Sequence, residues 1–433
     1  MKFQAVKGTR DFYPEEMRVR NWIIDAWRKV SVRNGFVEYD APIFEYLELF
    51  TVKSGEEIAE QLFNFTDRGG RNIAIRPEIT PSLARMIAAK INSLPRPIKW
   101  FSVPRVCRAE RPQRGRLREF FQWNVDIVDE NSVQADAECI YVCIDFLREV
   151  GLTPADVKIH IGHRPLIMAM LRGRGVSDEN MDKALLALDK RPKISHEAFV
   201  EMLENANLAP AGIQGVCEFM DTSSADALSV LDTIDGMEEH KRNLRELGAA
   251  LENMGVGEYV TFDWHIVRGL AYYTGAVYEA LAAGERAVAG GGRYDKLLEI
   301  VGGPAASATG FGMGDVVLGI LLQEKGLIPA KILCESLDYY IIDGGEGTFP
   351  AVLKLAGELR LRGATADYSF RRQNVGKQLK EANRRGAKAA VIVENPDITA
   401  EGSITIKNLA TGEQASATSA EILGRHDGTS NTL

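Results

Sequence analysis

The sequence predicts an α+β fold in two parts, a larger N-terminal part and a smaller C-terminal α/β part. Three observations support it. Residues 98–128 hold two β-patterned runs around an arginine-rich loop, and a helical stretch at 164–257 separates them from further β-patterned runs. Beyond GLIPAK at 326–331, which is typical of a linker, strand and helix patterns alternate. Such alternation indicates a small α/β domain with a largely parallel core.

Composition limits the class of protein. A chain of 433 residues has room for two or three domains, and 45% hydrophobic and 26% charged residues are typical of a soluble globular protein. No apolar run is long enough to cross a bilayer, and MKFQAVKGTRDF lacks the apolar segment of an export signal, so we expect a cytoplasmic protein without membrane contact. The net charge of −8 argues against nonspecific DNA coating and leaves RNA binding to local basic patches.

The cysteines and histidines do not predict a metal site. Five cysteines are scattered without a CxxC motif, and the six histidines form no ligand set. Cys139 and Cys143 are four residues apart in a helical pattern, which favours a packing face over a pair of metal ligands. We expect reduced thiols and no bound metal ion.

The hairpin at 98–128 carries most of the information. Its loop region holds six arginines and no lysine: Arg105, Arg108, Arg111, Arg114, Arg116 and Arg118. The run that follows alternates, with Phe121, Trp123, Val125 and Ile127 on one face and Gln122, Asn124 and Asp126 on the other. A solvated hairpin with a charged turn is the alternative. The exclusive use of arginine favours phosphate binding, and the polar row suits a small polar ligand lying on a sheet.

The flanking elements follow from local patterns. Residues 14–35 are amphipathic and predict a helix. The run 36–50 is extended but contains Pro42, which indicates an edge or interface strand. A helix is expected from about Pro81, another near 133–150, and a strand over Val157–Gly162.

Four further motifs are candidates for a binding site, each with a structural alternative. Glu78 and Thr80 in Arg76–Thr80 could hold an ammonium group, or could mark the start of a helix. Arg268–Gly275 combines arginine, glycine and a tyrosine pair, as a ligand wall or a strand turn would. The three glycines of Gly290–Asp295 allow a flat ligand or a tight bend. The alternating glycines of Gly310–Gly314 would clear one strand face for an adenine ring, and no P-loop lysine follows them.

A basic helix is expected in the C-terminal part, at NVGKQLKEANRRGAK. Its predicted buried stripe is Val375, Leu379 and Ala382. Its cations are Lys377, Lys380, Arg384, Arg385 and Lys388. They are consistent with RNA phosphate contacts, and a solvated helix face is the alternative.

Taken in order, these motifs resemble those of the histidyl-tRNA synthetases, which are class II aminoacyl-tRNA synthetases. APIFEYLELF resembles motif 1, the dimer-interface strand, and CRAERPQRGRLREFFQWNVDI resembles motif 2. IVRGLAYYTG and AGGGRYD resemble the two histidine signature blocks. The resemblance runs from KGTRDFYPEEMRVR to VIVENP near residue 396.

The resemblance implies an antiparallel sheet flanked by helices in a catalytic domain at 1–325, with the insertion at about 164–257. It implies an anticodon-binding α/β domain at 332–425, and we expect a disordered tail at 426–433. The implied partners and cofactors are L-histidine, ATP with Mg²⁺, histidine tRNA and a second copy of the chain, with no membrane and no DNA.

The resemblance also implies residue roles. Arg108 and Arg268 would be catalytic, flanking the α-phosphate and contacting histidine, and Arg108 would also contact ATP. The histidine site would further include Glu78, Thr80, Gln122, Asp126, Tyr272, Tyr273 and Tyr294. ATP would be bound by Glu110, Arg116, Gly312 and Gly314. The tRNA would be contacted by Arg111, Gln113, Arg114, Lys377, Lys380, Arg384 and Arg385.

The chain departs from the family pattern at three positions. Val316 stands where motif 3 usually has the arginine that grips the γ-phosphate of ATP, Ala271 replaces an aspartate, and Asp126 replaces a glutamate. The first departure keeps an alternative open, a non-catalytic histidine-sensing regulatory subunit of ATP phosphoribosyltransferase. The motif 2 arginines and the C-terminal domain favour the ligase. A more distant alternative, an RNA-binding protein without a small-molecule site, conflicts with the glycine clusters and the polar row.

Overall fold

The computed structural model describes residues 3–54, 62–191, 194–222, 226–267, 273–284, 286–333, 337–371, 373–401 and 403–425. The chain forms two compact units, Met1–Ile328 and Pro329–Leu433. Each unit has its own sheet and its own hydrophobic core.

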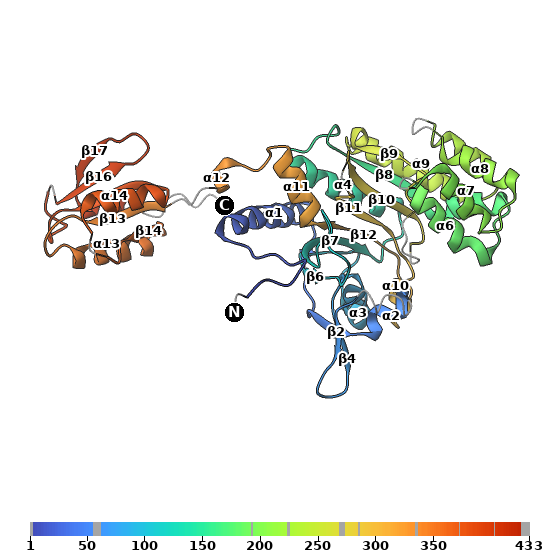
Figure 1. The fold of residues 1–433 in the computed structure, drawn as a ribbon, viewed down its shortest axis with the longest axis horizontal. Helices are drawn as coiled ribbons and strands as arrows, with labels where there is room; N and C mark the ends of the chain where they lie inside the picture. The colour runs from blue at the N-terminus through green and yellow to red at the C-terminus, as the bar shows by residue number, and fades with distance from the viewer. Residues whose placement is uncertain are drawn as a thin grey trace. The chain divides into compact units, whose positions relative to one another are not determined.

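A large mixed sheet forms the centre of the first unit (Figure 1). All pairings in it are antiparallel except β1 with β5 and β8 with β9, so the predicted antiparallel sheet is confirmed. In spatial order the strands are β1 (Val37–Glu38), β5 (Ile98–Ser102), β7 (Glu119–Val128), β12 (Ala308–Gly314), β11 (Ala289–Arg293), β10 (Ala276–Ala282), β8 (Val157–His163) and β9 (Val260–Phe262), and β6 (Arg105–Cys107) pairs with β7.

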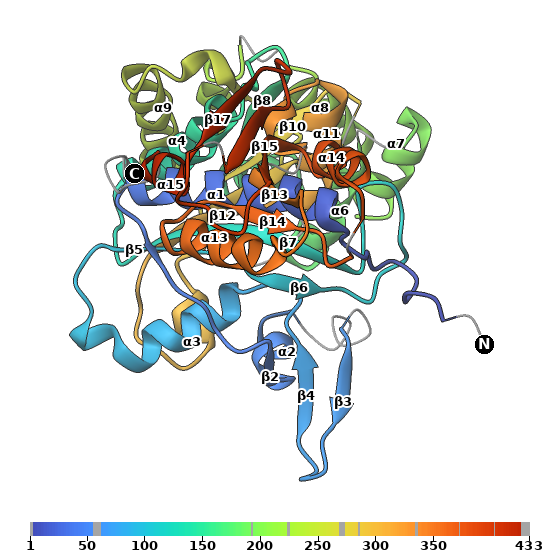
Figure 2. The same ribbon diagram turned by 90° about the vertical axis from the view of Figure 1, so that its left-hand side faces the viewer.

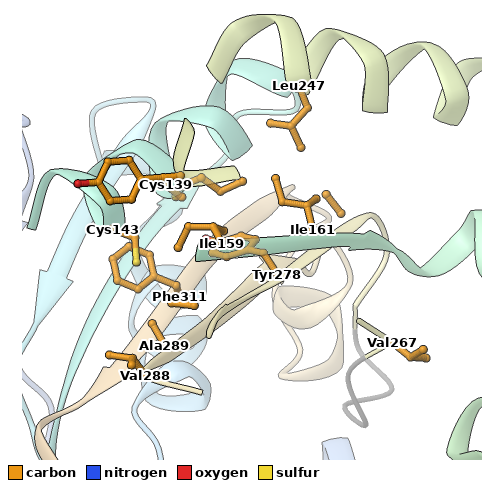
Figure 3. Close-up of a cluster of buried hydrophobic side chains, with 14 of the residues drawn as sticks. Cys139, Cys143, Ile159, Ile161, Leu247, Val267, Tyr278, Val288, Ala289 and Phe311 are labelled. Carbon is orange, nitrogen blue, oxygen red and sulfur yellow. The ribbon is translucent and has the colours of Figure 1, made fainter. Parts of the chain in front are cut away.

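Long helices cover one face of this sheet and bury the main core of the unit. Figure 3 shows Cys139 and Cys143 among the side chains of this core, together with Ile159 and Tyr278. Both thiols are fully buried, which confirms the predicted packing face. The helices that contribute to this core include α1 (Pro14–Arg33), α4 (Val133–Glu149), α9 (Glu238–Asn253) and α11 (Asp315–Glu324).

A second, smaller core lies between the sheet and two other helices, α3 (Thr80–Lys90) and α10 (Leu297–Ile300). Next to them, a small antiparallel sheet projects from the unit (Figure 2). It is built from β2 (Phe44–Tyr46), β4 (Asn72–Ile75) and β3 (Asn64–Thr66), and α2 (Glu48–Ser54) follows β2. The single extended run expected at 36–50 was therefore wrong in detail, because the chain forms two short strands and then starts a helix.

The stretch 164–257 is helical, as predicted. Its buried side chains belong to the main core of the first unit, where α9 packs against α4. The elements are α5 (Arg164–Gly173), η3 (Asp178–Asn180), α6 (Met181–Lys190), α7 (His196–Glu204), α8 (Pro210–Met220), η5 (Ser229–Thr233) and α9, with η6 (Gly257–Tyr259) after it and η2 (Ile91–Ser93) elsewhere in the unit.

The second unit has the predicted parallel core, formed by β13 (Leu337–Asp343) between β14 (Ala366–Tyr368) and β15 (Ala387–Val393). Gly363 and Gly386 have φ of +86° and +63° just after helices, as helix-ending glycines do. Sequence reasoning missed two antiparallel strands, β16 (Ile404–Asn408) and β17 (Gln414–Ala417). The helices are α12 (Ala330–Leu333), in the expected linker, α13 (Phe349–Leu361), α14 (Val375–Arg384) and α15 (Ser419–Gly424).

Candidate active site

A cavity of about 250 Å³ opens on the face of the central sheet formed by β7, β12 and β11. It also takes in the start of α3, the loop before β7 and the start of α11. Ten of the residues expected from the sequence line it: Glu78, Thr80, Arg108, Arg116, Gln122, Asp126, Tyr273, Tyr294, Gly312 and Gly314. Side chains that are more than two hundred residues apart in the chain therefore meet in one place.

Strand β7 forms the floor of the cavity, and its two faces have different surroundings. Trp123, Val125 and Ile127 are buried in the main core on one side. Gln122, Asn124 and Asp126 line the cavity on the other. The alternation predicted from the sequence is confirmed, because a strand directs successive side chains to opposite faces.

Glycines on the neighbouring strand leave space above this polar row. In the register of β12 and β7, Gly310 pairs with Asp126 and Gly312 with Asn124. A β-carbon on Gly310 would lie 2.2 Å from Asp126 Oδ1, and one on Gly312 would lie 2.7 Å from Gln122 Nε2. The alternating glycines of β12 are thus required by the polar side chains opposite them as well as by any ligand.

The polar row presents buried acceptors without donors. Gln122 Oε1, Asn124 Oδ1 and Asp126 Oδ2 are buried, and none accepts a hydrogen bond from the described residues. A buried acceptor left without a donor costs free energy, on the order of 1–3 kcal/mol each. Such a row fits a ligand that carries several N–H groups.

Asp126 and Tyr294 form a deeply buried polar pair in the cavity. The Tyr294 hydroxyl donates to Asp126 Oδ1. Burial raises the pKa of Asp126 to about 7, the Tyr294 hydrogen bond acts in the opposite direction, and the charge of Glu78 adds to the rise. Asp126 is therefore a carboxyl group that changes charge near neutral pH, facing the ligand space.

Glu78 and Thr80 lie at the start of α3. The segment is fixed by Arg76, whose Nη1 contacts Asp40 Oδ1 at 2.8 Å and whose Nε donates to the Arg105 carbonyl at 3.0 Å. Thr80 is the first residue of α3, and the N-cap position is Ile79, which makes no side-chain capping hydrogen bond. The motif therefore fits both interpretations, because it starts a helix and its Glu78 and Thr80 also line the cavity.

Arginines of the loop before β7 lie at the rim of the cavity. Arg108 donates from Nε to the Pro77 carbonyl at 3.1 Å, and its guanidinium lies 5.1 Å from the ring centre of Phe120. Arg116 is ion-paired with Glu110. These contacts orient two guanidinium groups at one end of the ligand space.

The expected tRNA-binding residues of the same loop lie further out. Arg111 is exposed. Gln113 Oε1 accepts from Arg286 Nη2 at 2.6 Å, and Arg114 Nη2 contacts Glu324 Oε1 at 2.6 Å. The loop is held by contacts with the ends of neighbouring elements of the sheet unit.

Two cavity residues were missed as site candidates although the sequence contains a signal for them. Asn124 lies in the same period-two row as Gln122 and Asp126. Phe120 is an aromatic residue in phase with that polar row, where its ring faces the cavity beside Arg108. An apolar aromatic on a polar strand face would have indicated a ligand-stacking position.

Arg268 and Tyr272 lie outside the described residues, and so does the tail 426–433. In the second signature block the period-two pattern separates the roles. Tyr294 faces Asp126, whereas Arg293 and Asp295 point to a different polar cluster, with Arg293 Nε 2.9 Å from Asp136 Oδ2.

The expected basic helix of the second unit is α14. Lys377 and Lys380 are exposed. Arg384 contacts Glu381 at 2.6 Å, and Arg385 contacts Asp367 at 3.0 Å, so these two charges are partly offset within the unit. The buried face includes Gln378, which the sequence did not predict, together with Ala382.

Within the described residues, no group of three or more His, Cys, Asp or Glu side chains is placed to hold a metal ion. The described helices also include none that is both long and apolar enough to span a membrane.

Comparisons with known proteins agree with this layout. The family model described as "Histidyl-tRNA synthetase" matches residues 8–314, and the one described as "Anticodon binding domain" matches residues 338–425. The two units thus have the make-up of an aminoacyl-tRNA synthetase. The chain belongs to the histidyl-tRNA synthetase family.

Individual relatives support the same family. The histidine–tRNA ligase of Opitutus terrae is 41% identical over 415 residues, covering 94% of each chain. That of Haloarcula marismortui is 38% identical over 431 residues, covering 98% of each. The histidyl-tRNA synthetase structure from Nostoc sp. PCC 7120 superposes with a TM-score of 0.81 at 24% identity, covering 98% of this chain and 99% of that one.

The fold alone does not separate the ligase from its regulatory relative. A Bacillus halodurans structure described as an ATP phosphoribosyltransferase regulatory subunit/histidyl-tRNA synthetase also superposes, with a TM-score of 0.73 at 24% identity over 87% of this chain and 94% of that one. The family model and the full-length relatives at 38–41% identity favour the ligase.

Proposed function

We propose that this chain is an aminoacyl-tRNA ligase that joins L-histidine to histidine tRNA in two steps. Histidine and ATP first give histidyl-adenylate and pyrophosphate, and the histidyl group then moves to the 3′ end of the tRNA. The observation that carries the proposal is the row of buried acceptors on β7. This row lies beside the glycines of β12, which leave open space above it, and the guanidinium groups of Arg108 and Arg116 line the same cavity.

The acceptor row suits histidine because histidine brings N–H donors at both ends. The ammonium group would be bound by Glu78, Thr80 and Gln122. The imidazole would lie against Asp126, with Tyr294 fixing the carboxyl oxygen that does not face the ligand. Tyr273 and, by resemblance, Tyr272 would close the imidazole pocket.

Activation needs charge placement rather than a proton acceptor. The ionised carboxylate of histidine attacks the α-phosphorus of ATP, a new C–O–P bond forms, and the bond to the leaving pyrophosphate breaks. Arg108 would stabilise the charge that grows on the α-phosphate oxygens. Arg268 would act from the other side, a role that rests on the first signature block. Positioning and preorganised charge are the large terms in such reactions.

ATP, entering as its Mg²⁺ complex, would occupy the remaining space. Glu110 would contact the base, Arg116 the γ-phosphate, and Gly312 and Gly314 would leave room for the nucleotide. Mg²⁺ keeps much of its water and binds phosphate oxygens, so it needs few ligands from the chain.

The tRNA would be contacted at two places. Arg111, Gln113 and Arg114 would reach the acceptor end. Lys377, Lys380, Arg384 and Arg385 would contact the anticodon arm. We assign catalysis to residues 1–325, with the insertion at 164–257, and anticodon binding to residues 332–425.

We further propose a cytoplasmic homodimer. The small projecting sheet carries three exposed aromatic side chains, Phe44, Tyr46 and Phe65, and the Phe44 and Phe65 rings lie 6.0 Å apart. An exposed aromatic patch of this kind favours a protein interface. Sedimentation of the purified chain would give twice the chain mass, and a monomer at micromolar concentration would contradict the dimer.

Two assays test the function. Purified chain should charge histidine tRNA and should catalyse histidine-dependent ATP–pyrophosphate exchange. Arg268→Ala should abolish exchange while the unfolding transition is unchanged. Exchange by this variant within a factor of two of wild type would remove the role given to Arg268, and absence of both activities in the wild type would refute the ligase proposal.

A further inference from the structure

Val316 leaves the phosphate end of the cavity with an apolar side chain. Val316 and Val317 both line the cavity at the start of α11. A nucleoside triphosphate carries several negative charges, and charge-assisted hydrogen bonds stabilise each of them best. Of the two guanidiniums already described there, Arg116 is shared with Glu110. A further cation at this rim would stabilise the bound phosphates.

Arg286 lies at this rim and comes from a different element. It precedes Ala287, Val288 and Ala289, which line the cavity, and the Val288 carbonyl accepts from Gly314 N at 3.4 Å, directly before α11. The segment that leads into β11 therefore lies beside the residue that precedes α11, and Arg286 and Val316 are each two residues from this contact.

The Arg286 side chain crosses to the arginine loop. Its Nη2 donates to Gln113 Oε1 at 2.6 Å. A β-carbon on Gly115 would lie 3.6 Å from Arg286 Cδ and 3.1 Å from Val317 Cγ2. The aliphatic part of Arg286 and the Val317 side chain thus meet over the same glycine, which itself lines the cavity. Gly115 has φ of +72°, a conformation that favours glycine and keeps this approach open.

We propose that Arg286, in the segment before β11, binds the γ-phosphate of ATP and so supplies the positive charge that position 316 does not provide. The inference rests on the proposed function and adds a residue to its nucleotide site. The side chain is exposed and its partner in the structure is a neutral amide, so it can turn from Gln113 to a phosphate without leaving a buried charge unpaired.

The charge at position 286 should matter for ATP and not for ADP, because only ATP has the γ-phosphate. Arg286→Ala should raise the KM for ATP in histidine-dependent exchange about tenfold or more and leave the KM for histidine within a factor of two. Inhibition of exchange by ADP should change less than twofold. Arg286→Lys should recover part of the loss, because it keeps the charge but not the planar fork.

A second-site variant makes the inference sharper. Arg286→Ala combined with Val316→Arg should regain most of the ATP affinity, since the charge would return to the same phosphate from α11. Arg242→Ala, on an exposed face of α9, is the matched control and should leave both KM values unchanged.

Three results would overturn the proposal: an unchanged KM for ATP in Arg286→Ala, an equal loss for ATP and ADP, or no recovery in the double variant. An equal loss would mean that Arg286 only holds the loop through Gln113. Lack of any exchange by the wild-type chain would instead refute the ligase function, so the two failures are distinguishable.

Discussion

Asp126 and Arg293 are both buried charged residues near the central sheet, but their surroundings differ. Asp126 Oδ2 accepts from none of the described residues. Arg293 donates to Asp136 at 2.9 Å, to Asp295 at 3.3 Å and to the carbonyls of Glu130 and Ser132. The cluster around Arg293 borders its own cavity of about 180 Å³.

Buried polar groups therefore serve two purposes in this protein. Around Arg293 the charges offset one another, so the cluster fixes the ends of β11 and α4. Around Asp126 the acceptors lack donors, so the folded chain carries a free-energy cost that a ligand can relieve. The same signature block contributes to both, because Tyr294 faces one cluster and Arg293 the other.

The largest effect is expected from breaking the buried ion pair of Arg293 with Asp136. Arg293→Ala leaves the Asp136 carboxyl buried without its cation and should lower the free energy of unfolding by about 3–5 kcal/mol. Urea denaturation measures it. Arg242→Ala, an exposed position, should change stability by less than about 0.5 kcal/mol. Equal effects of the two variants would mean that the Arg293 cluster is not structural.

Neutralising Asp126 should raise the free energy of unfolding instead of lowering it. The pKa of Asp126 in the folded chain is about 7, above the usual value near 3.8. The contribution of Asp126 to stability is therefore fully present below pH 4 and is lost as the pH rises to about 7. Asp126→Asn removes that loss. It should gain about 4 kcal/mol of stability at pH 8 and nearly nothing at pH 4, while losing histidine activation. A variant less stable than wild type at pH 8 would contradict the unsatisfied state of Asp126.

Filling the cleared space should affect activity more than folding. Gly312→Ala places a methyl group against the Gln122 amide, the movable end of a side chain, so the fold can adjust. We expect kcat/KM for histidine in exchange to fall about a hundredfold, or ~2.7 kcal/mol, with unfolding changed by less than about 1 kcal/mol. Gly319→Ala on α11, where a β-carbon meets nothing, is the control. Comparable exchange by both variants would argue against a ligand above the β7 row.

The smallest effect is expected in the second unit. Lys377→Gln with Lys380→Gln should raise the KM for tRNA severalfold, by about 1 kcal/mol, and should weaken its salt dependence. Arg384→Gln should do less, because Glu381 already offsets that charge. A larger loss for Arg384→Gln would show that internal pairing does not predict which cations bind RNA.

Periodicity and motif order predicted much of the molecule. The alternation along β7 follows from sequence because a strand directs alternate side chains to opposite faces, and the glycines of β12 indicated a cleared surface. Strand β16 was missed because its alternation of Ile404 and Ile406 with polar residues spans only five residues, and β17 has no distinctive apolar pattern. The run 36–50 was assigned to one strand because it has no marked breaker except Pro42. Asn124 and Phe120 were visible in the pattern but were not selected.

Patterns along the chain were enough to predict which residue types stand on which strand face, the helical character of 164–257 and the family. They could not determine that Arg293 would be paired while Asp126 Oδ2 would accept from none of the described residues, or that Arg286 and Val317 would meet over Gly115. Those outcomes depend on the register of β7, β12 and β11 and on which distant groups pack against each strand end. Local patterns fix the direction of a side chain, but only the folded arrangement decides which partner it meets.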